Sequence, residues 1–240
     1  MDSLPGALAA ERAGADRIEL CGSLADGGIT PSAGLIESCV SGLAVPVHVL
    51  VRPRVGNFRY SRVELEVIRR DVEMARRFGA AGVALGALGA GGNIDLEATA
   101  RLVDAAGMLE VTFHRAFDLA ADPLRALEDL ISLGVRRVLS SGGAPTASRG
   151  ARLLRELVEA AAGRIVILPG GGIGPENAAR ICRTTGAREV HASCRSRRRR
   201  SAGGRGRALP GPALQALFGS APAAIDPERV RKLAHVLRGL

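Results

Sequence analysis

Two hydrophobic patterns alternate along the chain. Short apolar runs rich in Val, Ile and Leu are followed by longer stretches in which apolar residues recur every three or four positions. The first pattern is typical of buried β-strands and the second of amphipathic helices, and their alternation indicates βαβ units around a parallel sheet. We expect strands at residues 17–21, 45–52, 82–86, 110–115, 137–140, 164–169 and 189–193.

Helical patterns fill the intervals between these strands. Asp2 or Ser3 would cap the first helix, and Asp226 would cap a last helix at 226–239. Strand and helix repeat at roughly the length of a βαβ unit, about thirty residues. This spacing predicts an α/β fold, a single TIM-type (β/α)8 barrel domain over residues 1–240. The other helices are expected at 4–13, 32–42, 61–78, 95–106, 123–133, 148–162 and 175–185.

The predicted barrel is one strand short, because the chain opens on a helix and a TIM barrel has eight strands. An open parallel sheet would leave an unpaired edge. Either the true start lies upstream, or the barrel is open by one strand, or the carboxyl-terminal tail supplies a replacement. We favour the first alternative, so the first strand is expected to be missing from this chain.

Composition and charge narrow the choice of partners. Aromatic residues make up 2% of the 240 residues, so stacking platforms for single-stranded nucleic acid are not expected. From Arg195 onward eleven Arg and Lys stand against Asp226 and Glu228, which places the whole formal charge of +9 there and leaves the rest of the chain neutral. We interpret the Arg-, Gly- and Pro-rich segment at 195–222 as an atypical, solvated stretch and do not expect nucleic-acid binding.

The cysteines give no sign of an oxidising compartment. Cys21, Cys39, Cys182 and Cys194 lie far apart and form neither a zinc-binding spacing nor a disulfide framework. No stretch has the pattern of a leader or of a membrane-spanning helix. We therefore expect reduced thiols, a cytoplasmic location and no membrane contact.

Alternation along the predicted strands places many polar side chains inside the barrel. In strand 110–115, Val111 and Phe113 would face the helices, which turns Thr112 and His114 inward and leaves Arg115 at the rim where the strand ends. Unpaired charges in that interior would be costly, so such groups must pair, bind water or hold a ligand. The same alternation on three other strands turns inward Glu19, Cys21, His48, Arg52, Glu189, His191 and Ser193.

Two glycine-rich loops follow predicted strands, "SSGGAP" at 140–145 and "PGGGIGPENAAR" at 169–180. Glycine lets backbone N–H groups approach an anion, and a helix N-terminus adds a favourable partial charge. The alternative is that these glycines only make tight turns. The phosphate hypothesis places an anion against Gly142, Gly143, Gly170, Gly171 and Gly172.

Seven motifs, read in order, resemble the CutC family: "GADRIELC", "GGITPS", "VPVHVLVRPR", "VTFHRAFD", "SSGGAP", "LPGGGI" and "VHASCR". The resemblance covers residues 2–196. It implies a TIM-barrel fold, a cytoplasmic and oligomeric protein, and a link to copper homeostasis with copper(I) bound through cysteines. Members begin with a cysteine-containing strand ahead of the position of Asp2, and an Arg-rich run here replaces most of their closing segment.

Two functional hypotheses follow from these residues. A metal-handling protein would bind copper(I) through Cys21 and Cys194, because copper(I) prefers thiolate and imidazole donors. An enzyme acting on a small anionic metabolite, as a lyase, isomerase or hydrolase, would use a carboxylate as base and an imidazole as acid. The base would be Glu19 or Glu189, the acid His114 or His48, and the ligand would be bound by Arg52, Arg115, His191 and Ser193.

A third hypothesis is purely structural. The inward polar side chains would then pair with one another in a buried network without any turnover. These side chains are Glu19, Arg52, His114 and Glu189. The stretch "RPRVGNFRYS" at 52–61 would be a solvated loop, or a lid over the barrel mouth if a ligand binds there.

Overall fold

The computed structural model describes residues 1–195 and 224–240. Its centre is one parallel sheet in which neighbours in sequence are neighbours in space. The sheet curls, so that the chain has an α/β, TIM-like barrel architecture. Its six strands are β1 (Ile18–Leu20), β2 (Val47–Leu50), β3 (Gly82–Leu85), β4 (Glu110–Phe113), β5 (Arg137–Ser140) and β6 (Val166–Pro169).

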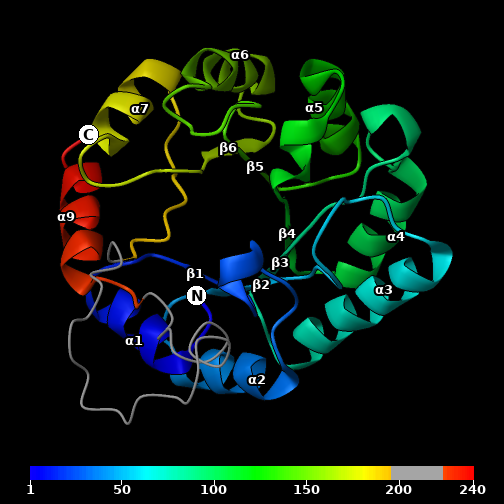
Figure 1. Cartoon of the computed structure of the whole chain (residues 1–240), viewed down its shortest axis with the longest axis horizontal. Helices are drawn as coiled ribbons and strands as arrows, with labels where there is room; N and C mark the ends of the chain where they lie inside the picture. Colours follow the sequence, from blue (N-terminus) through cyan, green and yellow to red (C-terminus); the bar gives the residue numbers. More distant parts are fainter. Residues whose placement is uncertain (196–223) are drawn as a thin grey trace, which may run out of the picture.

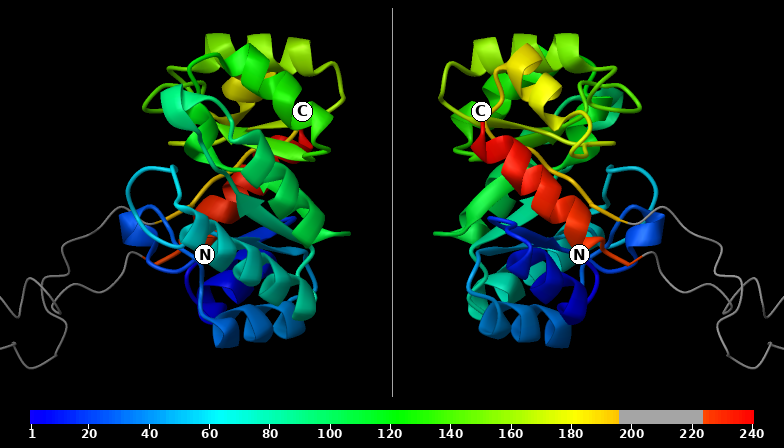
Figure 2. Two further views of the ribbon diagram at one scale, coloured as in Figure 1. Left: turned by 90° about the vertical axis from the view of Figure 1, so that its right-hand side faces the viewer. Right: turned by 90° about the vertical axis from the view of Figure 1, so that its left-hand side faces the viewer.

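The helices surround the curled sheet (Figure 1). The side views in Figure 2 show the last helix crossing the outside of the interval between the first and last strands. This helix, α9, packs against both α7 and α1. The helices are α1 (Leu4–Arg12), α2 (Ala33–Gly42), α3 (Arg62–Arg77), α4 (Leu96–Ala106), α5 (Pro123–Ser132), α6 (Ala151–Ala161), α7 (Ala178–Thr185) and α9 (Pro227–Arg238), with 3-10 turns η1 (Leu24–Asp26), η2 (Ala90–Gly92) and η3 (Arg115–Leu119).

Side-chain alternation along the strands follows the sequence prediction. Val47 and Val49 of β2 belong to the large core between sheet and helices. Leu50 of the same strand belongs to a separate small cluster with Cys21 and Ala84 inside the barrel. The two clusters are the two faces of one sheet, which confirms the predicted alternation for this strand.

The seventh predicted strand is wrong. Residues 189–193 are extended but form no ladder with the sheet. One backbone hydrogen bond, from the His191 N–H to the Pro169 carbonyl at 2.8 Å, joins this segment to the end of β6. A strand needs repeated bonds to a neighbour, and this segment has a neighbour only at that point.

The helix predicted from 175 also begins later, at Ala178, so that Pro175 precedes it.

The outer edge of β1 is paired only at its end. The Met1 amino group donates to the Glu19 carbonyl, and the Cys21 N–H donates to the Met1 carbonyl at 2.7 Å. Within residues 1–195 and 224–240, no strand pairs with this edge. The expectation that a first strand is missing stays a prediction. Residues 196–222 of the Arg-rich segment lie outside the described part of the chain.

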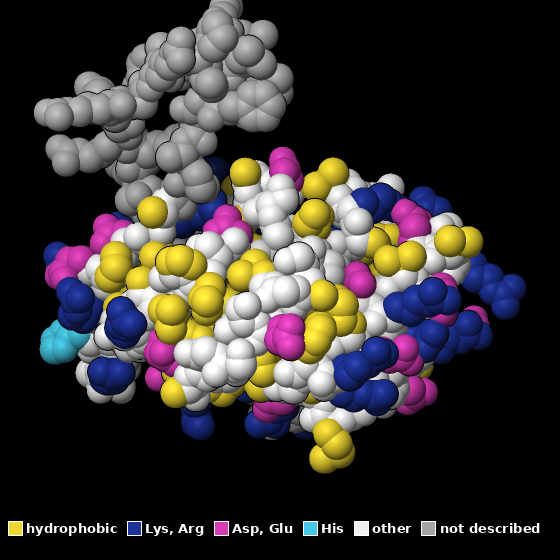
Figure 3. All heavy atoms as spheres, turned by 90° about the horizontal axis from the view of Figure 1, so that it is seen from below, with side chains coloured by type: hydrophobic (Ala, Val, Ile, Leu, Met, Phe, Trp, Pro, Cys, Tyr) yellow, Lys and Arg dark blue, Asp and Glu magenta, His cyan; other side chains and the backbone are white. Residues whose placement is uncertain are grey.

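The described surface carries mixed charge. On α3, Arg69 pairs with Glu66 and Glu73, and Arg70 pairs with Glu66. Figure 3 shows basic and acidic side chains interspersed around apolar ones on the face seen from below. This fits the neutral charge of the chain outside its carboxyl-terminal part. Among the described helices, none combines the length and the hydropathy that crossing a bilayer requires.

Candidate functional site

The amino ends of the strands carry a group of ion pairs, here called the amino-end network. Arg137, which opens β5, donates from Nη1 to Glu110 Oε2 at 2.5 Å and from Nε to Glu189 Oε2 at 3.0 Å. Arg17, just before β1, donates from Nη2 to the same Glu189 oxygen at 2.7 Å. Glu189 therefore ties the extended segment to both sides of the curled sheet. The hydrogen bonds from the two arginines outweigh burial and lower the pKa of Glu189.

His48 is the fifth member of the amino-end network. The strand register places it between Glu19 of β1 and Gly82 of β3. A side chain at Gly82 would approach the imidazole to 2.6 Å, so only glycine leaves room for the ring. Its Nε2 lies 3.5 Å from Glu110 Oε2. Burial, aided by Arg17 and Arg137, lowers the pKa of His48 to about 4, so this imidazole is neutral at pH 7.

The opposite ends of the strands hold a different group, here called the carboxyl-end cluster: Arg52, Phe58 and His114. Arg52 follows β2 and is 8% exposed, and His114 follows β4 and is 5% exposed. The Arg52 guanidinium lies over the Phe58 ring, with Cζ 4.9 Å from the ring centroid. The Phe58 and His114 ring centroids are 4.8 Å apart. One aromatic ring thus covers both polar groups.

Two buried N–H groups of this cluster have no hydrogen-bond partner in the described part of the chain: Arg52 Nε and His114 Nε2. The Nη atoms of Arg52 donate to the carbonyls of Gly28 and Gly56 at 3.0 and 2.9 Å. The Ala116 N–H donates to His114 Nδ1 at 3.2 Å, which puts the imidazole proton on Nε2. Burial, with Arg52 adding to it, lowers the pKa of His114 to about 3. The cluster therefore presents one cationic and one neutral donor.

Arg115 anchors the loop after β5. It donates from Nε to Asp118 Oδ2 at 2.7 Å and from Nη2 to Ser141 Oγ at 2.8 Å. Asp118 accepts in addition from the Ser140 hydroxyl at 2.6 Å and from the Gly143 N–H at 3.2 Å. The "SSGGAP" loop is thus held by a carboxylate of this chain, which occupies part of the place predicted for an external anion.

At the glycines of both loops, a larger residue would clash with its neighbours or need an unfavourable backbone conformation. A Cβ at Gly142 would lie 2.3 Å from the Gly150 carbonyl oxygen, and one at Gly170 would lie 2.5 Å from the Leu139 side chain. Gly143, Gly171 and Gly172 have positive φ. The tight-turn interpretation therefore accounts for all five without a phosphate, and phosphate binding there stays a prediction.

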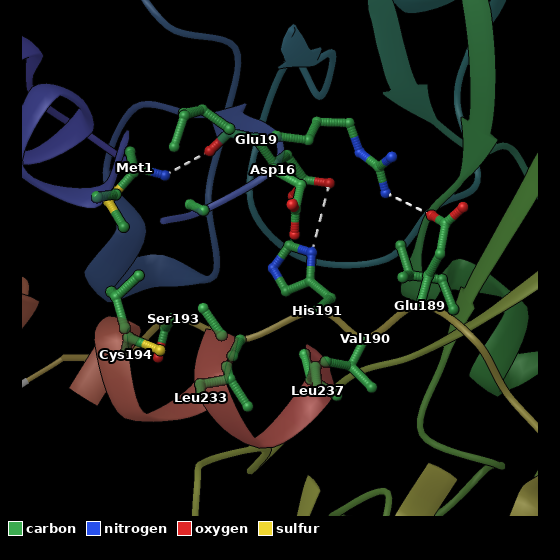
Figure 4. A pocket seen from close by; sticks show the side chains of 18 of the residues that line it. Met1, Asp16, Glu19, Glu189, Val190, His191, Ser193, Cys194, Leu233 and Leu237 are labelled. Carbon is green, nitrogen blue, oxygen red and sulfur yellow. Dashed lines mark hydrogen bonds and ion pairs between the residues drawn. The ribbon is translucent and has the colours of Figure 1, made fainter. Parts of the chain in front are cut away.

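A cavity of about 530 Å³ lies between β1, the extended segment and α9. Figure 4 shows Glu19 and His191 facing each other across it, with Cys194 at one end. The His191 Nδ1 is 3.8 Å from Glu19 Oε2. Cys21 and Ser193 also line this space. The cavity gathers several predicted site residues but neither His114 nor Arg52.

The two predicted copper ligands have different surroundings. Cys21 packs inside the barrel with Leu50 and Ala84, whereas Cys194 belongs to the core beneath the helices. Burial raises the pKa of both thiols, which disfavours the thiolate that binds a metal. Over residues 1–195 and 224–240, no three His, Cys, Asp or Glu side chains are grouped as a metal site would require.

Sequence reasoning missed several members of these groups. Arg137 could have been predicted, because the alternation applied to the other strands turns it inward on β5. Asp118 belongs to the quoted motif "VTFHRAFD" but lies on η3, where strand alternation says nothing. Arg17 and Glu110 stand at strand ends, so their partners depend on how far the sheet curls. The missed set is Arg17, Glu110, Asp118, Arg137, Ser140 and Ser141.

The curled parallel sheet, the surrounding helices and the polar groups at both strand ends define an α/β protein of the TIM-like barrel class. The chain belongs to the CutC family, whose model matches residues 1–196.

Individual relatives agree with this membership. A CutC family protein of Xanthomonas campestris pv. campestris is 50% identical over 194 residues, covering 81% of both chains. The human copper homeostasis protein cutC homolog is 48% identical over 198 residues, which cover 82% of this chain and 72% of the human one. The crystal structure of a CutC copper homeostasis protein from Streptococcus agalactiae has a TM-score of 0.77 at 34% identity, covering 80% of this chain and 94% of that one.

Proposed function

We propose that this protein binds a small molecule through an anionic or carbonyl oxygen at the carboxyl ends of β2 and β4, as a TIM-barrel enzyme does. One observation carries the proposal: Arg52 Nε and His114 Nε2 are buried donors without acceptors. Leaving a buried donor unpaired costs about 1–3 kcal/mol. An oxygen atom of a ligand would supply the acceptor that both groups lack.

The two donors suit charge stabilisation rather than proton transfer. His114 stays neutral far below pH 7 because its pKa is about 3, so it offers a hydrogen bond and not a proton. The adjacent Arg52 supplies the positive charge. Such a pair stabilises negative charge that develops on a carbonyl oxygen during lyase or isomerase chemistry. Neither predicted base adjoins this pair, because Glu189 is engaged with two arginines and Glu19 lies in the separate cavity.

Access to these donors requires the loop 53–60 to move. Phe58 covers both groups, and the loop is fixed by the Arg52 bond to the Gly56 carbonyl and by a bond from the Leu88 N–H to the Phe58 carbonyl at 2.9 Å. Arg54 adds bonds to Glu64 and to the carbonyls of Asn57 and Arg59, and these partners of Arg54 are close in sequence to the loop. We propose that this loop is the lid that the sequence suggested.

The test is calorimetric titration of the full chain with a panel of 2-oxo acids and phosphate esters. A binding member should lose affinity at least tenfold in His114→Asn and in Arg52→Lys, since each removes one of the two donors. Arg155→Gln, on an exposed helix face, should bind as the parent does. Binding that is indifferent to both site variants, or no binding across the panel, would reject the proposal.

Copper(I) as cargo is a second candidate, favoured by the names of the human and mouse relatives. Cys21, Cys194 and His191 line one cavity, and all four cysteines are free and buried, which also supports the proposed cytoplasmic location. The raised thiol pKa values and the separate surroundings of the thiols count against tight binding.

A copper(I) titration against a chromophoric chelator, under reducing conditions, decides between the candidates. One tight equivalent that is lost in Cys21→Ser and retained in Cys39→Ser would establish cargo binding at the cavity. The absence of any competition with the chelator would eliminate copper(I) and leave the anionic ligand.

A further inference from the structure

We propose that Tyr60 supplies a third hydrogen-bond donor to the ligand of the carboxyl-end cluster, and that this ligand is a carboxylate. This assignment rests on the proposed function, because Arg52 and His114 are the other two donors. It narrows the ligand from any anionic or carbonyl oxygen to one chemical class, and it adds a residue that contacts the ligand.

The Tyr60 hydroxyl is buried and has no hydrogen-bond partner in the described part of the chain. The Tyr60 side chain packs against the core, and the Arg54 guanidinium lies over its ring, with Cζ 5.1 Å from the ring centroid. Burial raises the pKa of Tyr60, and the charges of Arg52 and Arg54 oppose this change only in part. The hydroxyl therefore keeps its proton at pH 7 and can donate a hydrogen bond.

Arg52 lies close to both Tyr60 and His114, because its positive charge acts to lower the pKa of each of these side chains. Tyr60 also belongs to the loop 53–60, whose Phe58 ring contacts Arg52 and His114. The proposed lid thus carries a donor of its own beside the two donors that it covers.

Three unpaired donors require a ligand with more than one acceptor oxygen. Arg52 Nε, Tyr60 Oη and His114 Nε2 each offer one hydrogen and have no acceptor among the described residues. A carbonyl oxygen has two lone pairs and can accept from two of these donors, whereas the two oxygens of a carboxylate can accept from all three. A ligand with a single carbonyl oxygen would leave one buried donor unpaired, which is costly.

The charge of the cluster favours a carboxylate over a phosphate. Arg52 is buried, both of its Nη bonds go to backbone carbonyls, and no carboxylate of the described chain forms an ion pair with it. His114 is neutral because of its low pKa, and Tyr60 keeps its proton, so the cluster holds one positive charge. A carboxylate neutralises this charge. A phosphate monoester carries close to two negative charges at pH 7 and would leave one of them buried and unpaired.

The fluorescence of Tyr60 tests the ligand class directly. Tyr60 is the only tyrosine of the chain, and the chain has no tryptophan, so tyrosine fluorescence reports on this site alone. The full chain is titrated with pyruvate and 2-oxobutanoate, with the amides of both acids, and with inorganic phosphate. At least one of the two acids should change the fluorescence and bind about tenfold or more tightly than its amide or phosphate, because the amide carries no charge.

Calorimetry with two variants tests the role of Tyr60. Tyr60→Phe should bind the acid about tenfold more weakly, because it removes one hydrogen bond to a charged oxygen. Its melting temperature should stay within about 2 °C of that of the parent, because the hydroxyl has no partner to lose. Thr99→Val is the matched control, since the Thr99 hydroxyl on α4 is also buried without a partner. This variant should bind the acid as the parent does.

The possible failures are distinguishable. Equal affinity for acid and amide, or tighter binding of phosphate, would overturn the carboxylate assignment. An unchanged affinity in Tyr60→Phe would overturn the role of Tyr60. In either case a loss of affinity in His114→Asn would mean that the proposed function still holds. No binding of any of these compounds would overturn the proposed function and the role of Tyr60 together.

Discussion

The two ends of the barrel hold similar residue types in opposite states. At the amino end, two arginines and two carboxylates pair with one another over distances of 2.5–3.0 Å. At the carboxyl end, Arg52 Nε and His114 Nε2 are buried and donate to nothing in the described chain. Polar residues inside a barrel are thus not evidence of a site in themselves. Polar side chains that pair with one another form a structural network. Buried donors that lack an acceptor indicate a binding cluster.

The difference assigns separate roles to two residues that sequence alone treats alike. His48 and His114 both lie in barrel strands or at their ends, and both are held neutral by burial. His48 Nε2 also makes no hydrogen bond in the described chain, but it has the Glu110 carboxylate at 3.5 Å, so an acceptor of the chain itself lies beside it. His114 has an arginine beside it and an unused N–H, so its surroundings need an acceptor from elsewhere.

Acidification should have the largest effect, because it charges both histidines. Each has a folded-state pKa, about 4 for His48 and about 3 for His114, below its unfolded value near 6.5. The unfolded state therefore binds more protons, and stability that is complete above pH 6.5 is lost as the pH falls toward 4. We expect a loss of roughly 2 kcal/mol for each histidine between pH 7 and 5.

Urea denaturation across this pH range measures the effect. A His48→Phe variant and a His114→Asn variant should each show a shallower pH dependence than the parent. His235→Asn, on the exposed side of α9, should retain the full slope. A parent stability that stays level from pH 7 to 5 would contradict the assignment of buried, neutral imidazoles.

Arg137→Met breaks the amino-end network at its centre. The variant leaves Glu110 and Glu189 facing each other without the cation that joins them. Removing one partner of a fully buried pair costs about 3–5 kcal/mol, and the partial exposure of the carboxylates reduces this to roughly 2–3 kcal/mol. Urea denaturation at pH 7 gives the value, with Arg155→Met as a surface control expected within about 0.5 kcal/mol.

The ligand affinity of Arg137→Met tests whether the two ends of the barrel act independently. A folded variant should bind a ligand of the carboxyl-end cluster as the parent does, because the network lies at the other end of the strands. A large loss of affinity at unchanged stability would show that the amino-end network is itself part of the binding site.

Much of the fold was predictable from the sequence, and the reason is local. Residues 137–140 form the strand that their apolar run predicts, and Ser3 caps α1 through its side chain. The strand at 189–193 failed because a strand depends on neighbours that its own residues do not encode. Its alternation of Val190 and Ala192 with polar residues is genuine, but the segment meets β6 at one bond.

The residues of the candidate site could be predicted from the sequence, but their arrangement in space could not. Strand alternation correctly selected His48, Arg52 and His114 as inward or buried groups. It grouped Glu189 with them as a catalytic base, whereas that carboxylate pairs with Arg17 and Arg137. Residues one strand length apart on the same face lie at opposite ends of the barrel. Periodicity does not predict at which end a side chain finds a partner within the chain.

The smallest effect on stability is expected from His114→Asn, the variant in the carboxyl-end cluster. An Asn side-chain oxygen can accept the Ala116 N–H that His114 Nδ1 accepts now. The variant replaces the unpaired Nε2–H with a shorter amide NH2, so its cost comes chiefly from the lost packing against Phe58. We expect a change in unfolding free energy below about 1 kcal/mol by urea denaturation, together with the tenfold loss of ligand affinity. If this variant instead destabilised the chain as much as Arg137→Met, then His114 would be a structural residue like those of the amino-end network, and the contrast between the two ends would not hold.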